Sequence, residues 1–80
     1  MEELIGTIKL FAGSYCPREY MYCNGQELPV NNYQTLLSIV GFQYGGNGRT
    51  TFKLPNLNEG REGDVPKYII CVNGIYPQRD

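Results

Sequence analysis

The spacing of glycine and proline is the feature that most limits what this chain can form. There are 10 glycines and 5 prolines among 80 residues, so each patterned run is interrupted early. Such interruptions favour short strands and turns over long helices. A chain of this size also buries only about 60–65% of its unfolded surface. We therefore predict one domain over residues 1–80 with a mostly β, small α+β fold. It should combine short antiparallel strands with one short helix and glycine-rich loops, and gain further burial by self-assembly.

Five runs have the composition of strands. They are residues 4–12, 19–23, 26–30, 50–54 and 66–73. The first run places apolar side chains on both of its faces, which suggests that each face is partly buried. Between the second and third runs, the Asn24-Gly25 pair suits a type I′ turn. We therefore expect these two runs to pair as a hairpin, with Pro29 at an edge or an end.

One helix is expected, over residues 32–40. Its apolar side chains recur at helical spacing: Tyr33, Leu36, Leu37 and Val40. Asn31 or Asn32 is suited to cap its N-terminus, and Gly41 to end it in the left-handed conformation. A helix this short is unstable alone in water, so it should dock on the rest of the domain.

Charge and composition exclude several function classes. Seven Lys and Arg stand against eight Asp and Glu, a net charge of -1, so the basic excess of a typical binder of duplex nucleic acid is missing. The sequence has no His, which rules out a Ser-His-Asp triad and His metal ligands. Glu59, Glu62 and Asp64 surround Arg61 in a glycine-flanked run that suggests a solvated loop. We expect no enzyme, no cofactor and no metal site.

The three cysteines, Cys16, Cys23 and Cys71, cannot all pair within one chain. The N-terminus has neither the positive nor the apolar region of a secretory signal. No apolar run approaches the roughly 20 residues of a membrane span. We expect reduced thiols packed as small apolar groups, and no membrane partner.

A glycine-dense segment, residues 45–49, is the main candidate for binding. Its backbone N–H groups could hold an anion beside Arg49. It could equally be a glycine turn that needs positive φ angles, and the absence of a Walker or dinucleotide pattern favours the turn. Among the seven tyrosines, Tyr44 and Tyr76 lie beside turns and suit a surface role. The candidate binding residues are Tyr44, Gly46, Asn47, Gly48, Arg49, Arg61 and Tyr76.

Several segments together resemble the phage tail collar domain family. They are residues 6–13, 17–20, 23–26 and 44–57, and the last of them matches a Tyr-Gly-Gly-x-Gly-x-Thr-x-Phe-x-Leu-Pro-x-Leu signature of that family. Residues 73–77 are similar to the C-terminus of longer members. The resemblance implies a tail or tail-fibre structural protein that assembles as a homotrimer or another homo-oligomer.

The chain departs from the family pattern at three places. Tyr20 stands where the family usually has Trp, and residues 57–61 replace the usual Leu-Arg-Gly-Arg. Residues 61–67 span the place where longer members carry a long, often His-bearing, receptor-facing segment. Metal binding and receptor recognition therefore do not carry over to this chain, because the matching residues are missing.

Two functions remain open. The first is a structural part of the virion tail, in contact with other phage tail proteins. The alternative is a stand-alone collar-derived module in the cytoplasm of the infected bacterial host. It would sequester a small anionic, nucleotide-like ligand or a host protein, because Arg suits phosphate and Tyr can stack on a base.

Overall fold

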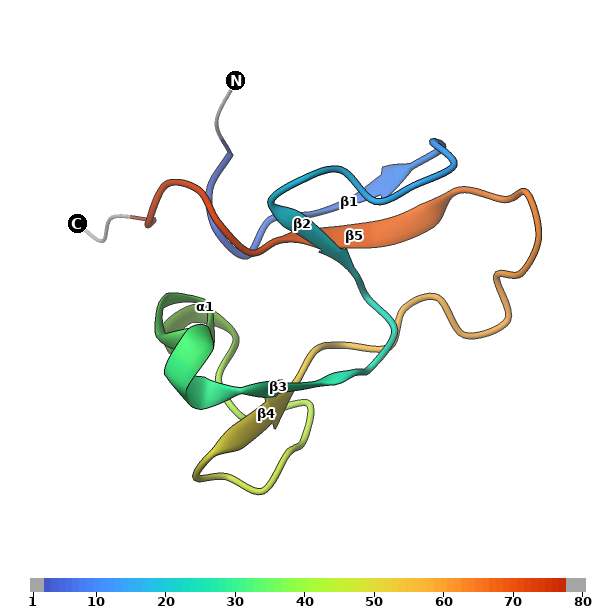
Figure 1. The fold of residues 1–80 in the computed structure, drawn as a ribbon. Helices are drawn as coiled ribbons and strands as arrows, with labels where there is room; N and C mark the ends of the chain where they lie inside the picture. The colour runs from blue at the N-terminus through green and yellow to red at the C-terminus, as the bar shows by residue number, and fades with distance from the viewer. Residues whose placement is uncertain (1–2, 78–80) are drawn as a thin grey trace.

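The computed structural model describes residues 3–77, and its largest element is a three-stranded antiparallel sheet (Figure 1). The sheet consists of β1 (Ile8–Phe11), β2 (Tyr20–Tyr22) and β5 (Lys67–Cys71), in the order β1-β5-β2. The last strand of the chain is therefore the central one. Ile70 illustrates the register, since it lies opposite Ile8 on one side and Met21 on the other.

A second, two-stranded sheet pairs β3 (Glu27–Pro29) with β4 (Thr51–Lys53). Between these strands the chain forms a 3-10 turn, η1 (Val30–Asn32), and the short helix α1 (Gln34–Val40). Figure 1 shows α1 beside the β3–β4 pair, on one side of the three-stranded sheet. The predicted fold class, small antiparallel sheets with one short helix, is confirmed.

The predicted hairpin around Asn24-Gly25 is wrong. Strand β2 pairs with β5, and β3 pairs with β4. A type I′ turn requires positive φ at both central residues, and here Gly25 has a φ of 77° while Asn24 does not have a positive φ. Asn24 instead forms an antiparallel bridge with Asn56. The chain thus crosses from one sheet to the other at this point.

The first strand is shorter than predicted. Within the expected run 4–12, the chain turns at Gly6, whose φ is 92°, and Thr7 N–H donates to the Leu4 carbonyl over 3.1 Å. The turn directs Ile5 into the core, where it is 6% exposed. A straight strand could not bury this side chain and also pair residues 8–11 with β5.

The expected ends of the helix are only partly observed. Tyr33 is the N-cap residue and no side chain caps the helix, because Asn31 and Asn32 belong to the preceding 3-10 turn. Gly41 ends the helix with a positive φ of 71°, as expected, but its ψ of −165° is extended and not left-handed helical. The apolar face is confirmed, since Leu36 and Val40 are buried.

One core joins the two sheets and the helix. Its members come from every layer: Ile5, Cys23, Leu28, Leu36, Val40, Phe52, Leu54 and Ile70. Phe52 and Cys23 are fully buried in it. All three cysteines are free, and burial raises the pKa of the Cys23 thiol to about 11. Cys23 therefore packs as a small apolar group, as the sequence suggested.

The side chain of Asn58 connects the loop after β4 to strand β5 and to the segment that follows β2. Its Oδ1 accepts a hydrogen bond of 2.7 Å from Tyr68 N–H, and its Nδ2 donates to the Tyr68 carbonyl over 3.0 Å. Nδ2 also donates to Asn24 Oδ1 over 2.9 Å. Asn58 is 8% exposed, the only buried polar or charged residue in the part of the chain described. Beyond the end of β2, its amide group thus makes the hydrogen bonds to the β5 main chain that a residue of a neighbouring strand would make.

We expect the substitution Asn58→Ala to lower the free energy of unfolding by about 2–3 kcal/mol, because it leaves the Tyr68 N–H without its acceptor. Urea denaturation measures the change. Asn56→Ala is the matched control. Asn56 is exposed and its side-chain hydrogen bond to Glu59 is long, at 3.4 Å, so this variant should lose less than about 0.5 kcal/mol of unfolding free energy. Equal losses for the two variants would contradict the role assigned to Asn58.

Candidate functional site

The side chain of Asn47 organises the glycine-dense loop between α1 and β4. Its Oδ1 accepts hydrogen bonds from the backbone N–H groups of Arg49 at 2.8 Å, Thr50 at 2.8 Å and Thr51 at 3.0 Å. Its Nδ2 donates to Thr50 Oγ1 over 2.8 Å. These N–H groups are among those that a bound anion would use, and here the chain supplies its own acceptor.

Gly46 brings this loop against the backbone of β4. Its φ is 101°, and a Cβ at this position would lie 2.5 Å from both Phe52 Cα and the Thr51 carbonyl oxygen. Gly48 also has a positive φ, 80°, but a Cβ there would meet nothing within 4 Å. The two glycines therefore differ: Gly46 permits a close approach of two backbone segments, and Gly48 only permits the turn.

Thr51 connects the loop to the neighbouring strand. Its Oγ1 accepts a hydrogen bond of 3.0 Å from Asn47 N–H and donates to the Glu27 carboxylate on β3. Asn47 thus holds the loop to β4, and Thr51 links it onward to β3. These contacts support the glycine-turn interpretation of the segment.

The two candidate arginines lie in different surroundings. Arg49 is exposed, and its side chain forms no hydrogen bond or ion pair with the residues described. The Arg61 Nε donates to the Pro66 carbonyl over 3.0 Å, and the guanidinium lies 5.3 Å from the centroid of the Tyr68 ring. Arg61 therefore serves to close the loop before β5.

The two candidate tyrosines also lie apart. The Tyr76 hydroxyl is 3.0 Å from Ser38 Oγ on α1, in a hydrogen bond that joins the end of the chain to the helix. Tyr44 borders a hollow that Ile8 and Ile39 also line. Within residues 3–77, no hydrogen bond or cation–π interaction joins Tyr44 or Tyr76 to either arginine. The candidate residues do not converge on one site, and their role in binding stays a prediction.

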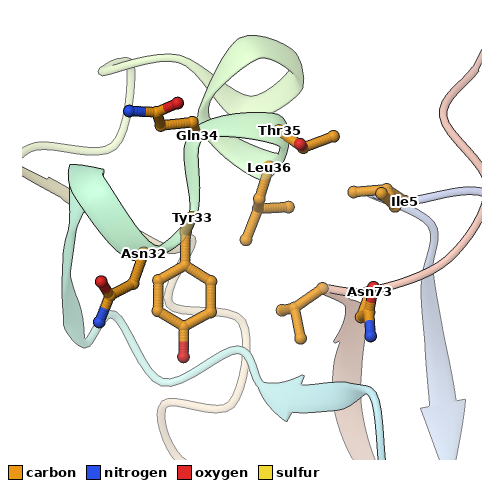
Figure 2. Close-up of a pocket in the computed structure, with 8 residues that line it drawn as sticks. Ile5, Asn32, Tyr33, Gln34, Thr35, Leu36 and Asn73 are labelled. Atoms are coloured by element: carbon orange, nitrogen blue, oxygen red, sulfur yellow. The ribbon is translucent and has the colours of Figure 1, made fainter.

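The sequence did not point to the hollow in Figure 2, which has a volume of about 310 Å³. Leu36 and Ile5 point toward the same space in Figure 2, beside the ring of Tyr33, while Asn32 and Gln34 point away from it. Its lining is completed by Thr35, Val72 and Asn73. Among residues 3–77, no charged side chain lines this hollow, so these residues supply no counter-charge for an anionic ligand.

The acidic residues around Arg61 do not form a chemical centre. Glu59, Glu62 and Asp64 are all exposed, as expected for a solvated loop. Across residues 3–77, no group of three His, Cys, Asp or Glu side chains could hold a metal ion. In the same part of the chain, no helix has the length and apolar character needed to cross a bilayer.

Comparison with known protein families identifies the family to which most of this fold, including the glycine-dense loop, belongs. The sequence model of the phage tail collar domain matches residues 6–60, more than half of the chain. The chain belongs to the phage tail collar domain family. A search of curated proteins finds no match. In this collar domain the matched residues include β1 to β4 and the glycine-dense loop.

The central strand β5 follows the matched region. Within the described residues, β1 and β2 pair with no strand other than β5, which spans Lys67–Cys71, whereas the family match ends at residue 60. The remaining residues of this collar domain therefore complete the sheet that the matched region begins. The likeness of residues 73–77 to longer members lies outside the match and stays a prediction.

We expect Asn47→Ala to lower the free energy of unfolding by about 1–2 kcal/mol, because three N–H groups lose their acceptor in a partly solvated loop. Arg49→Ala should change it by less than about 0.5 kcal/mol. Urea denaturation compares the two variants. A larger loss for Arg49→Ala would show that this side chain has a structural role.

The two glycines should differ in the same measurement. Gly48→Ala should cost about 1–2 kcal/mol, the penalty of a positive φ for a residue with a Cβ. Gly46→Ala adds a clash with backbone atoms and should cost at least about 2 kcal/mol more. If both variants are equally stable, the close approach at Gly46 does not hold in solution.

Proposed function

We propose that this collar domain is a structural component of a phage tail or tail fibre. It would lie in the virion tail and assemble with copies of itself and with other tail proteins. The family match over residues 6–60 carries the proposal. The homotrimer that the resemblance implies stays a prediction, since the structure describes a single chain.

The frame of the domain supports this proposal. Residues 61–66 run directly from the end of the matched region to β5, where the resemblance places a receptor-facing segment in longer members. The short connection leaves a domain made almost entirely of the sheets, the helix and their loops. Such a chain suits a part that contacts neighbouring tail proteins more than one that contacts a receptor.

The alternative, a module that holds a small anionic ligand, has less support. An anion in the glycine-dense loop would compete with the Asn47 side chain for N–H groups. Arg61 is engaged with Pro66 and Tyr68, so it is not held ready for a phosphate beside Arg49. Capture of a host protein remains a prediction without a contact in the structure to favour it.

Purified virions of the phage that carries this coding sequence test the proposal. An antibody raised against the chain should label the tail in electron micrographs, and mass spectrometry should find the chain in fixed ratio to a known tail protein. Antibody against an unrelated early phage protein is the control. Detection of the chain only in the cytoplasm of infected cells would overturn the proposal.

A further inference from the structure

The sequence contains three Asn-Gly pairs, at residues 24–25, 47–48 and 73–74. Asparagine is one of the chemically labile residues, and a following glycine hinders reaction at its side chain least. In that reaction the glycine nitrogen attacks Cγ of the asparagine. A hydrogen-bonded side chain reacts slowly, since it must first leave its partners and bring Cγ to about 3–3.5 Å from the nitrogen. The surroundings of each pair therefore decide how fast it reacts.

Two of the three asparagine side chains are held by hydrogen bonds. Asn47 Oδ1 accepts from the N–H groups of three following residues, and its Nδ2 donates to Thr50 Oγ1 over 2.8 Å. Asn24 Oδ1 accepts a hydrogen bond of 2.9 Å from the buried Asn58, and the main chain at Asn24 forms a bridge with Asn56. Both side chains would have to give up these contacts before they react.

Asn73 has no such restraint. It is exposed, and among residues 3–77 no group forms a hydrogen bond with its side chain or with the Gly74 N–H. Its main-chain carbonyl lies 3.6 Å from Cys71 Sγ, a contact that leaves the side chain free. Figure 2 shows the amide group of Asn73 at the side of the hollow, separate from the other labelled side chains. Within the described residues, neither reacting group has a hydrogen bond to break.

Glycine is required at position 74 because the backbone is tightly packed there. A Cβ on Gly74 would lie 2.3 Å from the Glu3 carbonyl oxygen and 3.0 Å from Cys71 Sγ. Ile75 N–H donates to the same Glu3 oxygen over 2.9 Å, and the Ile75 carbonyl accepts from Ile5 N–H over 2.8 Å. We call these two hydrogen bonds of Ile75 the terminal clasp. The packing thus keeps the glycine of the reactive pair beside the terminal clasp.

We propose that Asn73 is a site of spontaneous deamidation. The Gly74 nitrogen forms a bond to Asn73 Cγ and loses its proton, while the Cγ–Nδ2 bond breaks and Nδ2 leaves as ammonia. Solvent water then opens the succinimide ring at one of its two carbonyl carbons, and the product is aspartate or isoaspartate. The reaction involves no second chain, so it goes beyond the proposed function and does not depend on it.

Both products change the region of the terminal clasp. Each adds one negative charge to a chain whose net charge is -1. Isoaspartate also carries the main chain through its side-chain carbon, which lengthens the link between β5 and Ile75. Both ends of this link are fixed, since Val72 N–H donates to the Glu19 carbonyl over 2.9 Å and Ile75 is held by the clasp. The added length therefore strains the clasp, which holds Ile5 in the core at 6% exposed.

The deamidation rates of the three pairs within one molecule test the proposal. The full chain is incubated in isotopically labelled water at neutral pH, either folded or unfolded in guanidinium chloride. Peptide mass spectrometry then measures the labelled oxygen gained at each asparagine, and the unfolded rate divided by the folded rate gives a protection factor. Asn47 should be protected at least about tenfold more than Asn73, because several hydrogen bonds have to break before it reacts. Asn24 should also be protected more than Asn73.

The comparison has a clear contrary result. A protection factor at Asn73 as large as that at Asn24 or Asn47 overturns the proposal. Asn73→Gln is the matched variant, since the longer side chain must form a larger ring and reacts much more slowly. The folded variant should gain negative charge at least about tenfold more slowly than the wild type. Equal rates of charge gain would show that another residue is the main site.

Amide hydrogen exchange tests the effect on the terminal clasp. In the aged wild type, the N–H groups of Ile5 and Ile75 should exchange faster than in the fresh protein, because isoaspartate strains the hydrogen bonds that protect them. Aged Asn73→Gln is the control and should exchange as the fresh protein does. Unchanged exchange in a sample shown to contain isoaspartate at residue 73 would overturn the proposed effect on the clasp.

Discussion

The central position of β5 is the constraint on which the rest of the structure depends. Strands β1 and β2 do not bond to each other, so the three-stranded sheet exists only when the last strand of the chain lies between them. Their pairing joins residues that are 47 to 62 positions apart in the sequence, and contacts of that separation form slowly. Asn58 then fixes β5 from the side, through both main-chain groups of Tyr68, and ties it to the loop that follows the small sheet.

This arrangement would let the connection before β5 differ in length without disturbing the sheets. The match to the family ends at residue 60, and the central strand begins at Lys67. Between them, Arg61 reaches back to the Pro66 carbonyl, so the two ends of the connection lie close together. A segment inserted between such neighbouring ends need not disturb the sheet. The long segment that the resemblance implies for longer members would fit that geometry.

Local signals in the sequence located the elements but not their partners. Alternation and glycine spacing placed the helix and each strand within a few residues. The Asn24-Gly25 pair suggested a hairpin, yet the pairing of β2 is decided by β5, which no local pattern reveals. The candidate residues of the loop are neighbours in the sequence, and in the structure they lie together around Asn47. Arg61 and Tyr76 instead bond to other segments, at Pro66 and Ser38. The sequence did not reveal the role of Asn58, because its side chain bonds to Asn24 and Tyr68, which belong to other segments of the chain.

The distribution of satisfied and unsatisfied polar groups distinguishes the two possible interaction surfaces. In the glycine-dense loop, donors that could hold an anion are already bonded to Asn47, so a ligand gains only the difference between two acceptors. Along β1, the main-chain groups of Ile8 and Leu10 that point away from β5 face no other strand within residues 3–77, and the adjoining side chains are apolar. An added strand would gain main-chain bonds and apolar burial together there. The edge of the sheet therefore offers more free energy for association than the glycine-dense loop does.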